Sequence, residues 1–129
     1  MNELDLIAKE IVDSAYRVRS KLGPGLLESA YEACMAYELK KRGFQVVRQK
    51  PQPVVYDDLA IEVGCRLDKL VNEKVIIELK AVEKIAPIHQ AQLMTYLRLS
   101  DKSLGFLINF NVPLIKQGIR RMANNFQES

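Results

Sequence analysis

One apolar stretch of the chain, residues 75–80, carries an acid and a base two positions apart, Glu78 and Lys80. Side chains alternate along a β-strand, so both charged groups share one face of the strand that we expect there. Burying a carboxylate or an ammonium group costs free energy unless the group is paired or binds a ligand. The pair therefore marks a candidate functional site.

A second acid, Asp68, precedes this pair on a strand expected over residues 60–71. Two carboxylates suit Mg²⁺ or Mn²⁺, hard cations that keep several waters and leave room for a phosphate oxygen. In this hypothesis Asp68 and Glu78 hold the metal, and the backbone carbonyl of Leu79 adds a ligand. Lys80 would assist the attacking water or offset charge on the phosphate. Cross-strand ion pairs on a solvated sheet face are an alternative explanation of the same residue types.

The length of the turn between the two strands decides whether the two acids meet. A three-residue connection over 72–74 places Asp68 opposite Glu78. The same register places Arg66 opposite Lys80. A two-residue turn would instead direct Glu78 to the other face of the sheet. The metal-site hypothesis therefore predicts the three-residue connection.

Hydrophobic periodicity defines the elements that would position these residues. Apolar residues recur at helical spacing in three segments, whereas they alternate or run together in the strand segments. Two prolines in the first strand predict an edge strand or a bulge. The third helix is long enough to cross between parallel strands, which favours a mixed sheet with helices packed on it. The expected elements are helices over 3–22 and 26–42, strands over 44–55, 60–71 and 75–82, a helix over 87–99, a buried strand over 104–110, a short strand or helix over 115–123, and a fraying tail over 124–129.

Composition sets the class of protein. The 129 residues, 48% of them hydrophobic and 27% charged, predict a single soluble domain over 1–129. The acidic start and the absence of a long apolar run predict a cytoplasmic protein. Cys34 and Cys65 are isolated and are expected to be reduced. A single histidine, His89, argues against a zinc site, and the net charge of +3 permits nucleic-acid binding without requiring it.

The acids and the lysine together resemble the signature of a known nuclease superfamily. Asp68 followed by Glu78-Leu79-Lys80 resembles the D…E-x-K signature of the PD-(D/E)-x-K nucleases, although Lys69 interrupts the apolar run and the proline is absent. Residues 25–31 match the G-x-x-E-x-x-Y motif that names the GxxExxY protein family within that superfamily. Further matching stretches are residues 37–43, 77–84, 91–97 and 107–110. The resemblance implies a restriction-endonuclease-like α/β fold with an αβββαβ core, a mixed central sheet flanked by helices, and an additional N-terminal helix.

The resemblance also implies roles for residues outside the hairpin. Glu28 becomes a further catalytic acid that approaches the metal from the second helix, although a glutamate there also suits helix capping. Gln92 and Tyr96 match the Q-x-x-x-Y motif of RecB-like exonucleases and would line the nucleic-acid side of the site; a buried hydrogen-bonded pair is the alternative. Tyr31 and Arg66 complete the expected nucleic-acid-binding residues, with core packing as the alternative for Tyr31.

Two functions follow from these residues. The first is an Mg²⁺- or Mn²⁺-dependent nuclease that hydrolyses phosphodiester bonds of DNA or RNA. The second is a catalytically inactive nuclease-fold module that binds nucleic acid or a protein partner. The chain has almost no room for a target-recognition domain. We therefore expect a homodimer or a protein partner to supply specificity, and no membrane.

Overall fold

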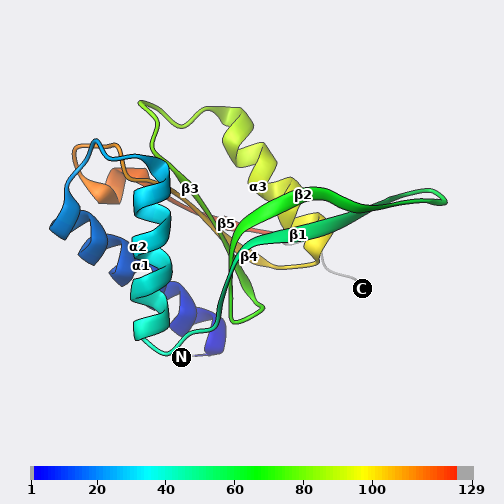
Figure 1. Ribbon diagram of the computed structural model, residues 1–129, viewed down its shortest axis with the longest axis horizontal. Helices are drawn as coiled ribbons and strands as arrows, with labels where there is room; N and C mark the ends of the chain where they lie inside the picture. The colour runs from blue at the N-terminus through cyan, green and yellow to red at the C-terminus, as the bar shows by residue number, and fades with distance from the viewer. Residues whose placement is uncertain (1, 125–129) are drawn as a thin grey trace.

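The computed structural model describes residues 2–124. Helices and strands follow one another along the chain in the predicted order, and the five strands form one sheet (Figure 1). The helix expected over 3–22 is confirmed at both ends, and the segment over 115–123 is a short 3-10 turn followed by a strand. Residues 125–129 of the expected tail lie outside the described part. The elements are α1 (Glu3–Leu22), α2 (Glu28–Lys41), β1 (Val46–Tyr56), β2 (Leu59–Val71), β3 (Val75–Lys80), α3 (Pro87–Ser100), β4 (Leu104–Asn109), η1 (Ile115–Gly118) and β5 (Ile119–Ala123).

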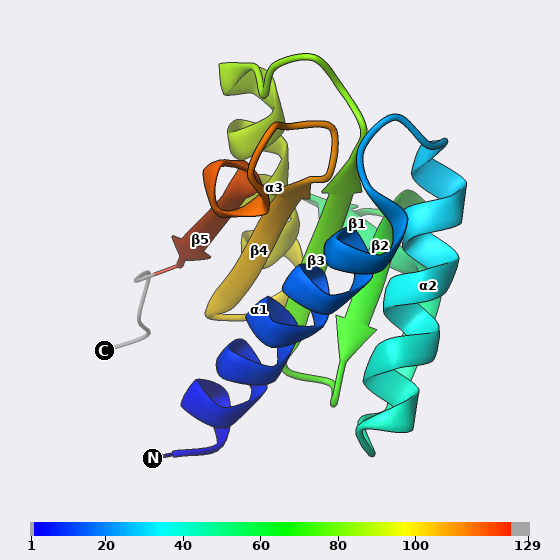
Figure 2. The same cartoon turned by 90° about the vertical axis from the view of Figure 1, so that its left-hand side faces the viewer.

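The sheet is mixed, as predicted, with the strand order β1-β2-β3-β4-β5. Strands β3 and β4 are parallel because α3 crosses between them, and the other neighbours are antiparallel. Helices α1 and α2 cover one face of the sheet and α3 covers the other (Figure 2). Every residue of β4 is buried, as expected for a strand enclosed between helical layers. This architecture is that of a restriction-endonuclease-like α/β fold.

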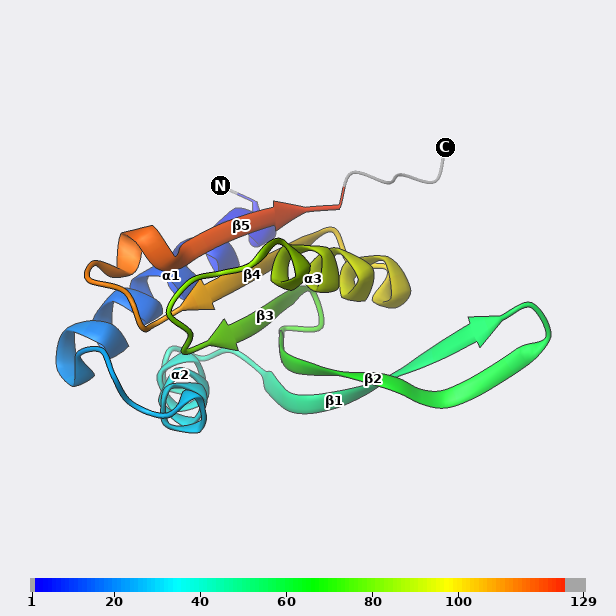
Figure 3. The same cartoon turned by 90° about the horizontal axis from the view of Figure 1, so that it is seen from above.

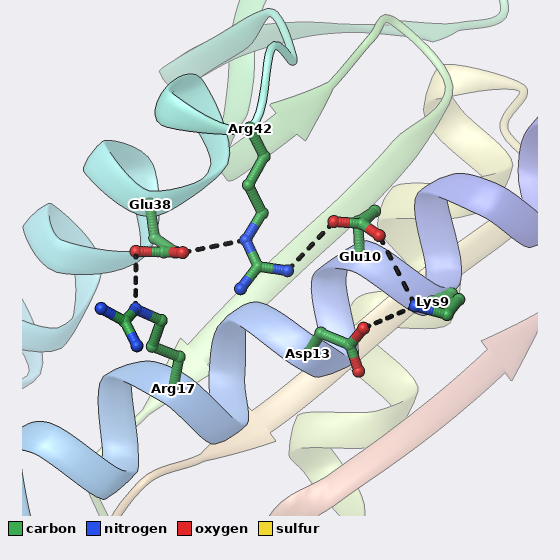
Figure 4. A network of polar contacts seen from close by, with 6 residues as sticks. All are labelled: Lys9, Glu10, Asp13, Arg17, Glu38 and Arg42. Carbon is green, nitrogen blue, oxygen red and sulfur yellow. Dashed lines mark hydrogen bonds and ion pairs between the residues drawn. The ribbon is translucent and has the colours of Figure 1, made fainter.

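Helices α1 and α2 pack side by side and are joined by a network of ion pairs (Figure 4). Arg42 at the end of α2 donates to Glu38 at 2.9 Å and to Glu10 of α1 at 3.0 Å. Arg17 of α1 approaches Glu38 at 3.8 Å. The network therefore fixes one helix against the other on the face of the sheet that they cover.

The turn before α2 explains why this helix begins at Glu28 and not at residue 26 as predicted. Gly23 and Gly25 have φ of 74° and 95°, a region that glycine enters without strain. The hydroxyl of Tyr31 donates to the carbonyl of Gly23 at 2.6 Å and accepts the N–H of Leu26 at 3.1 Å. These bonds hold residues 23–26 in a turn outside the helix.

Strands β1 and β2 continue past the body of the protein as a two-stranded arm, residues 52–65 (Figures 1 and 3). Strand β1 is an edge strand, as its prolines predict, and its pairing with β2 shifts between Gln52 and Val54. Large apolar side chains near the tip of the arm are exposed, including Tyr56 at 71%. None of the helices in residues 2–124 combines the length and the apolar character that crossing a membrane requires.

Candidate active site

The turn between β2 and β3 has the three-residue length that the metal-site hypothesis requires. Val71 pairs with Val75, so residues 72–74 form the connection and the predicted register is confirmed. Asn72 and Glu73 have φ of 51° and 57°, the left-handed conformation that tight hairpin turns use. Asp68 and Glu78 are consequently brought opposite one another.

Asp68 and Glu78, here called the acid pair, are linked by reciprocal bonds to the backbone. Glu78 Oε2 accepts the N–H of Asp68 at 2.8 Å, and Asp68 Oδ2 accepts the N–H of Leu79 at 2.9 Å. The regular β2–β3 register ends just before them, at Lys69 and Ile77. Where β2 diverges from β3, the backbone N–H groups of Asp68 and Leu79 therefore bond to side-chain carboxylates of the neighbouring strand instead of to backbone carbonyls. This arrangement fixes the position of both acids without any ligand.

Burial makes the acid pair electrostatically unfavourable. Asp68 and Glu78 are 9% and 8% exposed. Burial first, and then the negative charge of Asp68, raises the pKa of Glu78 to about 7, against the opposing effects of the Asp68 N–H and of nearby lysines. Burial likewise raises the pKa of Asp68. Two buried carboxylates that lack full compensation provide a site that favours positive charge.

Lys80 lies at the end of β3, half-buried, on the same side of the sheet as the acid pair. Its positive charge lowers the pKa of both acids. The ion pairs among residues 2–124 join neither Glu78 to Lys80 nor Asp68 to Arg66. The cross-strand ion pairs that offered another explanation are therefore not formed, and the ammonium group of Lys80 is available for a ligand.

Helix α3 brings Tyr96 close to the acid pair. Burial and then the charge of Glu78 raise the pKa of the Tyr96 phenol, which packs against the apolar residues beneath α3. Gln92 lies one turn earlier, is exposed, and makes no hydrogen bond within residues 2–124. The alternative of a buried Gln92–Tyr96 pair is therefore wrong. His89 accepts the N–H of Ala86 at 3.1 Å and so caps the start of α3.

Glu28 is the first residue of α2, and its side chain is exposed. The N-terminus of α2 and the C-terminal end of β3 lie at the same end of the molecule (Figures 1 and 2). Glu28 makes no hydrogen bond or ion pair with another residue of the described chain, so its carboxylate is free to approach a ligand at that end.

Of the residues expected to bind nucleic acid, Tyr31 does not reach the surface, and Arg66 lacks the pairing with Lys80 that was predicted for it. Tyr31 is fully buried and stacks on Phe110 with ring centroids 4.6 Å apart. The alternative that Tyr31 packs in the core is therefore correct. Arg66 is exposed on β2, where it pairs with Pro51 of β1. Because β3 turns away from β2 before that point, the predicted register between Arg66 and Lys80 is not formed.

The opposite face of β2 carries charges whose pairing residue types alone do not reveal. Lys69 follows Asp68 but points to the other side of the sheet, where its fully buried ammonium group lies 2.7 Å from Glu32 of α2. Arg48 of β1 also binds Glu32. Hydrogen bonds from Arg48 and Lys69 lower the pKa of Glu32 to about 2. We call Glu32, Arg48 and Lys69 the Glu32 cluster; the only sequence signal for it was a lysine in an apolar run.

The donor set at the acid pair fits a hard divalent cation. Among residues 2–124, no three His, Cys, Asp or Glu side chains gather in a way that could hold a metal ion. The protein would therefore supply two carboxylates, and water would complete the coordination, as Mg²⁺ prefers. Glu78 Oε1 has no hydrogen-bond partner in the described residues, whereas Glu78 Oε2 is occupied by the Asp68 N–H. This free oxygen and the raised pKa values both suit a cation.

A mixed sheet flanked by helices, with a buried acid pair and a lysine where its second and third strands diverge, defines a nuclease-like α/β protein. The family model described as the PD-(D/E)XK nuclease superfamily matches residues 5–122. The chain belongs to this superfamily, whose members generally use divalent metals and act on nucleic acids. No curated protein and no solved structure is similar enough to the chain to be matched with it.

Proposed function

We propose that this protein is an Mg²⁺- or Mn²⁺-dependent nuclease that hydrolyses phosphodiester bonds at the acid pair. The observation that carries the proposal is the interlocked pair itself. Asp68 and Glu78 are buried side by side, held by backbone N–H groups, and the pKa of Glu78 is raised to about 7. A purely structural pair of acids would destabilise the fold at neutral pH. A cation between them removes that cost.

Each residue of the site has a role in this proposal. Asp68 and Glu78 bind the cation, with the carbonyl of Leu79 as a further ligand. A cation bound there supplies an activated water and neutralises a phosphate oxygen. Lys80 orients the water or offsets charge on the phosphate through its free ammonium group. Glu28 approaches from the N-terminus of α2.

The substrate contacts in this proposal come from α3 and the arm. Tyr96 provides an aromatic face for a base or a sugar, and Gln92 provides an exposed amide for a phosphate. Arg66 offers a positive charge at the base of the arm, where a phosphate backbone would pass. A protein partner or a second copy of the chain would add specificity for particular substrates.

The direct test incubates the purified protein with single- and double-stranded DNA and RNA in Mg²⁺ or Mn²⁺. We expect cleavage that stops when EDTA is added. The cleavage rate should fall about 100-fold or more in Glu78→Ala and in Lys80→Ala, since each variant loses a group that stabilises the transition state. The matched controls are Glu83→Ala and Lys84→Ala, the same residue types in the exposed segment after β3. Both controls should cleave as the wild type does.

The alternative function gives a different result in the same experiment. A catalytically inactive module would cleave none of the substrates in either cation and would retain salt-sensitive binding to nucleic acid. Cleavage that survives both site substitutions would come from a contaminating enzyme. Either outcome would contradict the proposal.

A further inference from the structure

Gln49 has a backbone conformation that its position in a strand does not explain. It lies within β1 with a φ of 51°, in the left-handed region that side chains other than Gly, Asn and Asp seldom adopt. Its neighbours Arg48 and Lys50 pair with Lys69 and Leu67 of β2 in one continuous register, whereas Gln49 itself forms no strand pair there. Strain of this kind persists only where the surrounding structure imposes it, and it is common at functional sites.

The unusual conformation directs the side chain of Gln49 to the acid pair. Its Nε2 donates to Asp68 Oδ1 at 3.1 Å, while Leu79 N–H donates to Asp68 Oδ2 at 2.9 Å. The two donors come from β1 and β3, the strands on either side of β2. The carboxylate of Asp68 is therefore held from both sides, with one oxygen fixed by each neighbouring strand.

The amide group also suits this position because it is neutral. A lysine or an arginine would donate to the same oxygen, but its charge would compensate Asp68 and compete with a cation. An amide orients the carboxylate through a hydrogen bond and leaves its negative charge in place. The side-chain length matters as well, since the amide spans from the β1 backbone to an acid on the next strand.

We propose that Gln49 is a positioning residue that orients Asp68 for cation binding. The inference rests on the proposed function, which makes Asp68 a metal ligand. Residues that hydrogen-bond a metal ligand fix its orientation before the metal arrives, and their loss typically weakens binding about 10- to 100-fold. Gln49 is absent from the D…E-x-K signature and from the other motifs matched in the sequence.

The test measures Mn²⁺ binding by isothermal titration calorimetry for the full chain and for two variants. Gln49→Gly removes the side chain and relieves the left-handed backbone, and Gln49→Asn tolerates that backbone but is one methylene too short. We expect both variants to bind Mn²⁺ about 10- to 100-fold more weakly. We also expect the thermal midpoint of Gln49→Gly in EDTA to equal or exceed that of the wild type. A merely structural bond would lower this midpoint and leave the affinity unchanged.

The matched control is Asp57→Gly. Asp57 has a φ of 53°, so the substitution likewise places a glycine at a left-handed position, but at the tip of the arm. It should leave Mn²⁺ affinity unchanged. Wild-type affinity in both Gln49 variants would overturn the positioning role and leave the proposed function standing. A wild-type protein that binds no Mn²⁺ would overturn both.

Discussion

Asp68 and Lys69 are consecutive, oppositely charged and buried, yet their side chains meet different charged neighbours on the two faces of the sheet. On the face covered by α2, Lys69 meets the carboxylate of Glu32, which Arg48 also binds. On the face covered by α3, Asp68 meets another acid, and Glu78 keeps an oxygen without a partner in residues 2–124. The Glu32 cluster is complete within the protein. No ion pair among residues 2–124 reaches either carboxylate of the acid pair, so its charges are not compensated in the same way.

The pKa values of the two glutamates express this difference. The pKa of Glu32 lies near 2, because cations bind its charged form, whereas the pKa of Glu78 lies near 7, because burial disfavours its charged form. One carboxylate stabilises the fold when ionised and the other destabilises it. A buried charge therefore points to a ligand site when its surroundings leave that charge uncompensated.

The largest effect is expected from breaking the Glu32 cluster. Glu32→Ala leaves the fully buried Lys69 without a carboxylate, so the free energy of unfolding should fall by about 3–5 kcal/mol. Urea denaturation at pH 7 measures the change. As a control, Glu32→Leu combined with Lys69→Met removes both buried charges and should recover most of the loss. A loss below about 1 kcal/mol in Glu32→Ala would show that the cluster contributes little.

The next effect is a dependence of stability on pH that arises from Glu78. Its pKa is about 7 in the fold and 4.5 as the reference for the unfolded chain. Between these values the unfolded chain releases the proton and the fold retains it, so stability falls as pH rises from about 4.5 to 7. The shift corresponds to about 3 kcal/mol. Denaturation in EDTA across this range should show the fall in the wild type and not in Glu78→Gln.

The Glu32 cluster should show the opposite sign at lower pH. Because the pKa of Glu32 is lowered from 4.5 to about 2, its stabilisation is complete above 4.5 and is lost as pH falls toward 2. Glu32→Gln should lack this acidic transition in the same denaturation series. A wild type whose stability does not change between pH 2 and 4.5 would contradict the assignment.

A smaller effect is expected from Tyr31→Phe, an uncharged change on the face covered by α1 and α2. The variant keeps the stack on Phe110 but loses the hydrogen bonds to Gly23 and Leu26, so it should lose about 1–2 kcal/mol of stability. Mn²⁺ affinity, measured by calorimetry, should not change. A variant with normal stability and weaker Mn²⁺ binding would mean that Tyr31 takes part in the cation site.

The smallest effect is expected on the arm, which buries no charge on either face. Tyr56→Ser alters a side chain that is 71% exposed, so the free energy of unfolding should change by no more than about 0.5 kcal/mol. The same urea denaturation measures it. A larger loss would mean that the tip of the arm is buried against a partner in solution.

Local patterns accounted for the fold and for the acid pair, because helix periodicity and turn length act over short distances. The three-residue turn alone brought Asp68 and Glu78 together. Residue types could not reveal Gln49, since its contact depends on one backbone angle within a strand. They also could not separate Glu28 from Glu32, which are one helical turn apart, because the packing of α2 decides which of them faces Lys69.

The arm has a consequence for how this chain can be lengthened. Residues 57 and 58 join two strands whose distal halves are exposed, at a tip that lies away from the body (Figure 3). Exposed loop tips of this kind accept inserted segments, even whole domains, with little disturbance to the parent fold. A target-binding module grafted between Asp57 and Asp58 should leave the unfolding midpoint of the body unchanged. The arm therefore offers the body of the protein a point of attachment for a second binding module.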